Sequence, residues 1–119
     1  MKIAIASDDE RTISSHFGRA KGFVIYEVKE GEIINKEYRL NTFTPHVRGG
    51  DPHDRHGPIL RALKDCKVVI SHGMGRRIYE DLKKTGIEVF ITEETRVEEA
   101  LRRYLKGELV HREELECNH

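Results

Sequence analysis

The sequence predicts a single α/β domain built on a five-stranded mixed sheet. Three short apolar runs, residues 2–6, 67–71 and 87–91, are typical of buried strands, and helical patterns follow the last two. Two further strands, residues 23–28 and 32–40, are separated only by a short turn, which predicts a hairpin. A chain of 119 residues has room for one compact core of this kind.

The first strand carries the pattern of a central strand. In K-I-A-I-A, Ile3 and Ile5 share one face and the small Ala4 and Ala6 share the other. Because both faces are apolar, we expect this strand to be covered on both sides.

The hairpin and the segment after it differ sharply in composition. The two hairpin strands are rich in β-branched and aromatic residues, and Gly31 supplies a permissive backbone for the turn. Residues 41–57 then form the longest irregular stretch, with two prolines and three glycines. A loop of this length in a compact domain is usually functional or mobile.

Three helices are predicted in the second half of the chain. The first begins at Pro58, the second ends at Gly86 and the third ends at Gly107. The third should open with a capping box, in which Thr95 bonds forward and Glu98 bonds back. The residues expected on the inward faces are Ile59, Leu63 and Cys66, then Met74, Ile78 and Leu82, then Val97, Ala100, Leu101, Tyr104 and Leu105.

The connections between strands predict the sheet order 3-2-1-4-5. Strands joined by a hairpin run antiparallel, whereas strands joined through helices run parallel with right-handed crossovers. The loops after strands one, three and four should therefore leave the same edge, beside the switch point where open α/β sheets form ligand crevices. These loops carry His16, His46, His53, His56 and His72.

Composition excludes several classes of protein. The 21 basic and 21 acidic residues balance, so no nucleic-acid or membrane surface is expected. No apolar run approaches the length of a membrane span and the N-terminus does not resemble a signal peptide, which predicts a cytoplasmic protein. The absence of glutamine among abundant Lys, Arg and Glu suggests a thermophilic source.

The expected domain covers residues 1–107, and residues 108–119 form a polar tail. Two cysteines are too few for a disulfide scaffold, so both are expected to be reduced. Cys66 falls on an apolar helical face and is expected to be buried. Cys117 and His119 form a Cys-x-His pattern that could bind metal, although a frayed terminus is the simpler interpretation.

His16 is the strongest candidate for a functional residue. A neutral imidazole in a loop can ligate a transition metal. Phe17 could pack inward, Gly18 could permit an unusual backbone angle, and Arg19 could pair with an anion. The alternative is that Phe17 anchors the loop to the core and its neighbours are solvated.

Two other loops offer weaker candidates. His53 and His56 have a spacing common among metal ligands, but a solvated polar loop would look the same. In S-H-G-M-G, the amides of Gly73 and Gly75 could hold an anion at a helix N-terminus, or the glycines could serve only close packing. Met74 more often fills a core than binds metal.

Two other functional classes stay open. Asp8 and Asp9 follow the central strand and could form half of a two-metal hydrolase or nuclease site. The fourth strand ends in Ser71 and His72 instead of a carboxylate, which weakens that hypothesis. A regulatory module whose loops contact another protein is the third possibility.

The segments IAIASDD, SSHFGRAKGFVIYEV and DCKVVISHGMGRRIYEDLKKTGIEV resemble the dinitrogenase iron-molybdenum cofactor biosynthesis family, which includes NifX, NafY and the C-terminal part of NifB. The resemblance implies a ribonuclease H-like three-layer fold. Nitrogenase members hold iron-sulfur and iron-molybdenum cofactor precursors, and the histidine of the H-F-G motif is implicated in ligation. That role transfers to His16. The other matching motif positions are Phe17, Gly18, Arg19, Gly73, Met74 and Gly75.

The resemblance implies a small non-catalytic carrier or scaffold for an iron-sulfur or iron-molybdenum-type cluster. His16 would ligate metal, Arg19 and the amides of residues 73–75 would stabilise negative charge, and His53 and His56 could add ligands. Transient binding means that the protein could be purified without the cluster. The implied partners are proteins that donate or accept the cluster, with no nucleic acid and no membrane.

Overall fold

The computed structural model describes residues 1–41 and 57–111, and its sheet has the predicted order, β3-β2-β1-β4-β5. β1 pairs antiparallel with β2, and β2 with β3, whereas β1–β4 and β4–β5 are parallel. The elements are β1 (Lys2–Ser7), η1 (Phe17–Arg19), β2 (Gly22–Lys29), β3 (Glu32–Leu40), α1 (Gly57–Ala62), β4 (Val68–Ser71), α2 (Arg76–Lys84), β5 (Glu88–Ile91) and α3 (Val97–Leu105).

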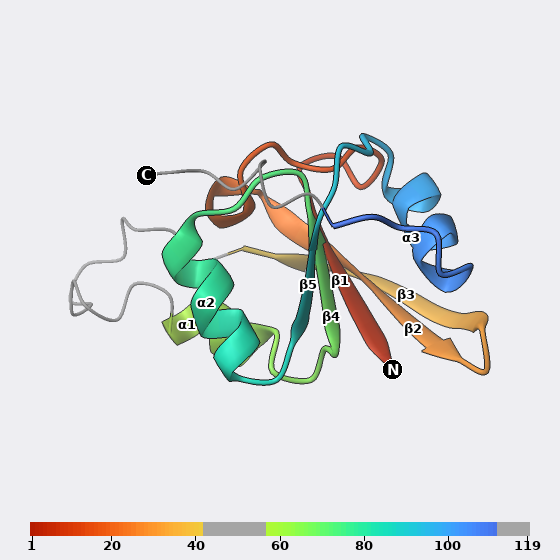
Figure 1. Ribbon diagram of the computed structural model, residues 1–119, viewed down its shortest axis with the longest axis horizontal. Coiled ribbons are helices and arrows are strands. Elements are labelled where there is room, and N and C mark those ends of the chain that lie inside the picture. Colours follow the sequence, from red (N-terminus) through yellow and green to blue (C-terminus); the bar gives the residue numbers. More distant parts are fainter. Residues whose placement is uncertain (42–56, 112–119) are drawn as a thin grey trace.

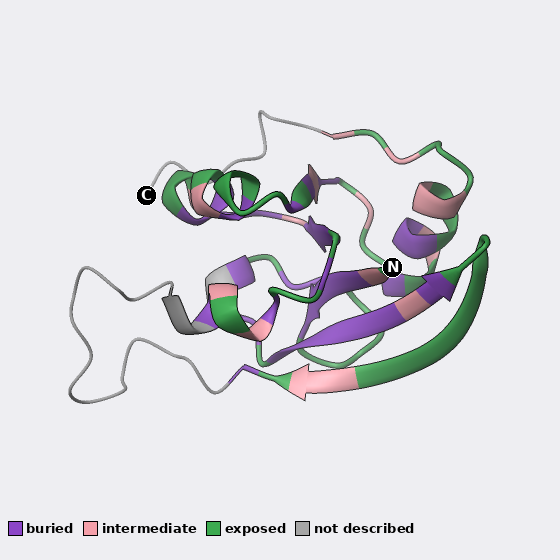
Figure 2. Ribbon diagram, turned by 90° about the horizontal axis from the view of Figure 1, so that it is seen from below, coloured by how far each residue is buried: buried purple, intermediate pink, exposed green. Residues whose placement is uncertain are grey.

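Helices cover both faces of the sheet, with α1 and α2 on one side and α3 on the other (Figure 1). β1 lies between two apolar clusters, as its pattern predicts. Ala4 and Ala6 belong to the cluster that includes α1 and α2, and Ile3 and Ile5 belong to the cluster that includes α3. Figure 2 shows the central strands buried and most of β3, at the edge, exposed.

The hairpin is constrained at both ends. At the turn, Glu30 and Gly31 have positive φ angles of 53° and 80°, which matches the right-handed twist of the flanking strands. At the other end, Tyr38 covers Gly22 so closely that a Cβ there would lie 2.5 Å from the tyrosine Cζ. The Tyr38 hydroxyl donates a hydrogen bond to the Ser7 carbonyl oxygen at 2.7 Å. The edge strand is thereby fastened to the end of β1.

The first predicted helix is shorter than its apolar spacing suggests. α1 ends at Ala62, and Leu63 and Cys66 reach the core from the turn that follows, where the Cys66 N–H donates to the Leu63 carbonyl at 2.9 Å. Both side chains are buried together with Ile59, as predicted. Burial follows the apolar spacing even where the regular helix has stopped.

The capping box predicted for the third helix is wrong. Arg96 is the N-cap of α3, and no side chain caps the helix. The Val97 N–H instead donates to the Arg11 carbonyl at 2.9 Å, and the Ile13 N–H donates to the Thr95 carbonyl at 2.8 Å. The loop after β1 therefore supplies backbone partners at the start of α3, where the sequence predicted a local side-chain cap.

Residues 108–111, the start of the predicted tail, contact the fold. Leu109 is half-buried against the cluster on the α3 face, and His111 reaches β5. In the two described ranges, no helix is long and apolar enough to cross a membrane.

Candidate functional site

The loops after β1 and β4 meet at one edge of the sheet, and β3 ends at the same edge, as the predicted topology requires. The loop after β3 starts at Asn41, whose N–H donates to the Lys21 carbonyl at 2.8 Å and whose Nδ2 donates to the Ala20 carbonyl at 3.0 Å. These two hydrogen bonds join the loop after β1 to the start of the segment that follows β3. His46, His53 and His56 lie outside the described residues, so their convergence with His16 stays a prediction.

The H-F-G-R segment is anchored from below by its aromatic side chain. Phe17 is 1% exposed and packs 5.2 Å from the ring of Phe23, and η1 begins with Phe17. His16 precedes η1 in an extended conformation, and its exposed ring forms no hydrogen bond with the described part of the chain. Burial of one residue therefore holds its neighbour at the surface.

The S-H-G-M-G turn lies directly beside this segment. The Phe17 N–H donates to the Gly73 carbonyl at 3.0 Å, and the Ser71 hydroxyl donates to the same oxygen at 2.8 Å. Met74 is 1% exposed and packs in the same cluster as Phe17. Phe17 and Met74 thus anchor the two loops.

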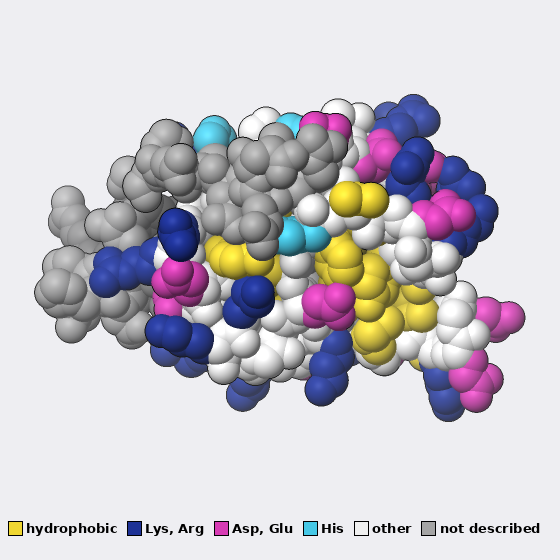
Figure 3. Space-filling model, in the orientation of Figure 1, with side chains coloured by type: hydrophobic (Ala, Val, Ile, Leu, Met, Phe, Trp, Pro, Cys, Tyr) yellow, Lys and Arg dark blue, Asp and Glu magenta, His cyan; other side chains and the backbone are white. Residues whose placement is uncertain are grey.

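Positive charge gathers in these two loops. Residues 16–21 and residues 72–77 each contain one histidine, two lysine or arginine residues and no acidic residue. Arg76 pairs with Glu80 at 3.3 Å, whereas Arg19, Lys21 and Arg77 form no ion pair within residues 1–41 and 57–111. The N-cap of α2 is Gly75, which offers no side-chain cap, and the first turn of the helix has no acidic residue. Backbone dipole and side chains therefore favour an anion. Figure 3 shows histidine side chains in the upper half of this face, one of them beside an acidic side chain.

His72 is held by a backbone group of the neighbouring strand. Its Nδ1 lies 3.0 Å from the carbonyl oxygen of Thr92, the residue that follows β5. Its position directly after a buried strand was the sequence signal for this site, but the partner of its ring depends on the tertiary structure.

The two aspartates after β1 organise the loop. The Asp9 carboxylate accepts hydrogen bonds from the N–H groups of Arg11 at 2.9 Å and Thr12 at 2.7 Å, and from the hydroxyls of Thr12 and Ser7. The two backbone donors are the main reason why its pKa falls to about 2. Asp8 accepts from the Lys21 N–H at 2.8 Å. Asp9 thus caps a local turn and Asp8 joins the two ends of the loop, and this structural use of both carboxylates does not favour the hydrolase hypothesis.

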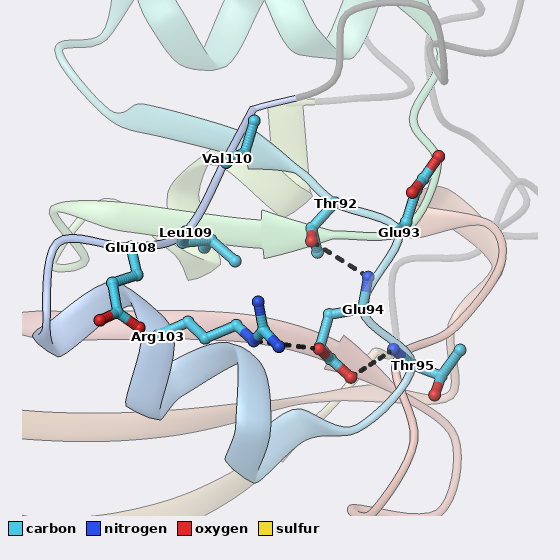
Figure 4. Close-up of a pocket in the computed structure, with 8 residues that line it drawn as sticks. All are labelled: Thr92, Glu93, Glu94, Thr95, Arg103, Glu108, Leu109 and Val110. Carbon is cyan, nitrogen blue, oxygen red and sulfur yellow. Dashed lines mark hydrogen bonds and ion pairs between the residues drawn. The ribbon is translucent and has the colours of Figure 1, made fainter.

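An open pocket of about 320 Å³ lies beyond β5, between residues 92–95 and 108–110 (Figure 4). Glu93, Glu94 and Glu108 line it, and its cation, Arg103, is bonded to Glu94 at 3.4 Å and to Glu99 at 3.2 Å. Carboxylates outnumber cations in this pocket, so it is poorly suited to an anionic ligand. The histidine-bearing loops are the better candidate.

The remaining predicted ligands are constrained in different ways. Cys66 is buried as predicted, and burial raises the pKa of its thiol to about 12, which disfavours the thiolate that binds metals. Among the described residues, no three His, Cys, Asp or Glu side chains gather to hold a metal ion. Cys117 and His119 lie outside the described residues.

Comparisons with known proteins agree on the family. The family described as dinitrogenase iron-molybdenum cofactor matches residues 1–107. An uncharacterized protein of Methanocaldococcus jannaschii is 34% identical over 109 residues, which cover 92% of this chain and 89% of that protein. NifX of Rhodobacter capsulatus is 34% identical over 77 residues, 63% of this chain and 48% of NifX.

A solved structure supports the same assignment. The structure titled as a putative NifB protein from Thermotoga superimposes with a TM-score of 0.69 at 29% identity, covering 92% of this chain and 91% of that one. The chain spans about half of the matched NifX, so the activity of the whole relative is not thereby assigned to it. The family match over residues 1–107 and the shared fold lead to one conclusion: the chain belongs to the dinitrogenase iron-molybdenum cofactor family.

Proposed function

We propose that this protein is a non-catalytic carrier that binds an anionic metal-sulfur cluster, of the iron-sulfur or iron-molybdenum type, at the loops after β1 and β4. The cluster is cargo, received from one protein and passed to another. The protein is expected to act in the cytoplasm, away from nucleic acid and membranes.

The hydrogen bond from Phe17 N–H to the Gly73 carbonyl carries this proposal. It holds the exposed His16 beside a turn that is cationic and free of acidic residues. An imidazole can ligate a cluster metal, while Arg19 and the start of α2 stabilise the negative charge of the cluster. The donor set therefore fits a metal-sulfur cluster.

Weak attachment is what a carrier requires. Sulfide within a cluster already supplies most of the coordination of its metals, so a few protein ligands are enough to hold it and to let it leave. His53 and His56 would add exchangeable ligands from the loop after β3. This part of the proposal rests on the sequence alone.

Anaerobic reconstitution with iron and sulfide tests the proposal. Metal analysis and absorption spectra should show stoichiometric uptake by the wild-type protein and loss of uptake in His16→Ala. His111→Phe, which removes a histidine outside these loops, should bind as the wild type does. No uptake by the wild type, or full uptake by His16→Ala, would overturn the proposal.

A further inference from the structure

The tautomer of His72 is determined by its hydrogen bond to β5. A carbonyl oxygen can only accept, so at 3.0 Å from the Thr92 carbonyl the His72 Nδ1 must carry the proton. A neutral imidazole has one ring proton. The Nε2 atom of His72 therefore has a free lone pair.

That lone pair is available for a ligand. His72 is partly exposed, and within the described residues its Nε2 forms no hydrogen bond. A ring whose one nitrogen donates to a carbonyl, leaving the other nitrogen free, has the arrangement found in metal-binding histidines. The hydrogen bond fixes both the tautomer and the orientation of the ring.

His72 also lies in the loop that is hydrogen-bonded to the loop of His16. Each histidine comes one residue before a partner in the hydrogen bond that joins Phe17 to Gly73 at 3.0 Å. Both loops are anchored by buried side chains, Phe17 in one and Met74 in the other. Two imidazoles are thus presented from neighbouring, firmly packed loops.

His111 shows how a purely structural histidine differs. Its Nδ1 accepts from the Ile91 N–H at 3.0 Å, and its Nε2 lies 3.2 Å from the Tyr79 hydroxyl. Both nitrogens of His111 are occupied, whereas one nitrogen of His72 is free.

We infer that His72 Nε2 is a second imidazole ligand for the metal-sulfur cluster, acting together with His16. The inference rests on the proposed carrier function and adds a ligand from the loop after β4 to the one from the loop after β1. A cluster that is ligated by both histidines would be held from the two loops that flank the switch point of the sheet.

The decisive variant is His72→Asn. The asparagine Nδ2 occupies the place of the histidine Nδ1 and can still donate to the Thr92 carbonyl, but nothing replaces Nε2. After reconstitution with iron and sulfide, His72→Asn should keep wild-type secondary structure and lose cluster to a chelator about tenfold faster or more. His111→Phe serves as the matched control and should retain the cluster like the wild type.

Two spectroscopic readouts separate a ligand from a structural residue. In the metal-free protein at about pH 8, where an ordinary imidazole is neutral, long-range ¹H–¹⁵N spectra should show the Nδ1–H tautomer for His72. In protein labelled with ¹⁵N-histidine, pulsed EPR of the reduced cluster should show two histidine couplings, one of which disappears in His72→Asn.

The outcomes distinguish the two proposals. No cluster in the wild type overturns the carrier function and this inference with it. Cluster bound by the wild type and held equally well by His72→Asn, or an Nε2–H tautomer for His72, overturns this inference alone. Faster loss from His72→Asn together with the vanished coupling supports it.

Discussion

His72 and His111 bind backbone groups of two consecutive residues at the end of β5, and they do so in opposite ways. His72 donates to the carbonyl of Thr92, on the side of β5 that faces β4. His111 accepts from the N–H of Ile91, on the free side of β5, and its ring stacks on Tyr79 at 5.7 Å. One ring keeps a free lone pair, and the other has none.

The difference separates a histidine that stabilises the fold from the proposed ligand. β5 is an edge strand, and an edge presents unpaired backbone groups. His111 satisfies one of these groups and packs between aromatic rings, so its contribution is to the folded state. His72 lies where the loops meet, and its contribution to folding is a single hydrogen bond.

The largest expected effect comes from Phe17, the anchor of the His16 loop that lies beside the loop of His72. Phe17→Ala should lower the free energy of unfolding by about 3–5 kcal/mol, because it leaves a cavity in the core beneath η1. Urea unfolding measures the loss. Phe17→Leu, which fills most of the cavity, should cost less than half as much.

The same variant sharpens the comparison between the two regions. Amide exchange in Phe17→Ala should become faster in residues 14–20 and 72–75, with Ile91 less affected. A loss below about 1 kcal/mol would mean that the loops are anchored by something other than this side chain.

A smaller effect is expected at His111. His111→Ala leaves the Ile91 N–H without its acceptor and removes the stack on Tyr79, which should cost about 1–3 kcal/mol in urea unfolding. His72→Asn is the matched control, because it keeps a donor to Thr92, and should lie within about 0.5 kcal/mol of the wild type. If both variants lost the same free energy of unfolding, the distinction between a structural His111 and a dispensable His72 would be wrong.

The smallest effect concerns the loop that leads to His16. The pKa of Asp9 is about 2, below its ordinary 3.8, because the folded loop donates hydrogen bonds to the carboxylate. A lowered folded-state pKa stabilises the protein above pH 4, and this stabilisation disappears as the pH falls through about 2. The urea concentration at the unfolding midpoint should therefore be higher for the wild type than for Asp9→Asn at pH 7. This difference should shrink between pH 4 and pH 2.

Glu10→Gln is the control for this titration. Glu10 is exposed and adjacent, and its substitution should leave the pH dependence as it is in the wild type. A gap between wild type and Asp9→Asn that stays constant with pH would show that the charge of Asp9 is not what orders the loop.

Most of the sheet was predictable because its signals are local. The alternation of Ile3 and Ile5 with Ala4 and Ala6 identified the two-sided central strand, and the hairpin and crossover rules then gave the order 3-2-1-4-5. The start of α3 was not predictable, because the partner of the Val97 N–H is Arg11, far away in the sequence. The ribonuclease H-like classification, which came from the family resemblance, stays a prediction.

The sequence by itself determined which segments are buried, the order of the strands and the edge at which the loops gather, because apolar periodicity and chain connectivity decide these features. It also singled out His16 through its motif. Only the tertiary structure decided which nitrogen of His72 and of His111 carries the proton. That choice depends on the backbone group at the end of β5 that faces each ring, an acceptor at Thr92 for His72 and a donor at Ile91 for His111.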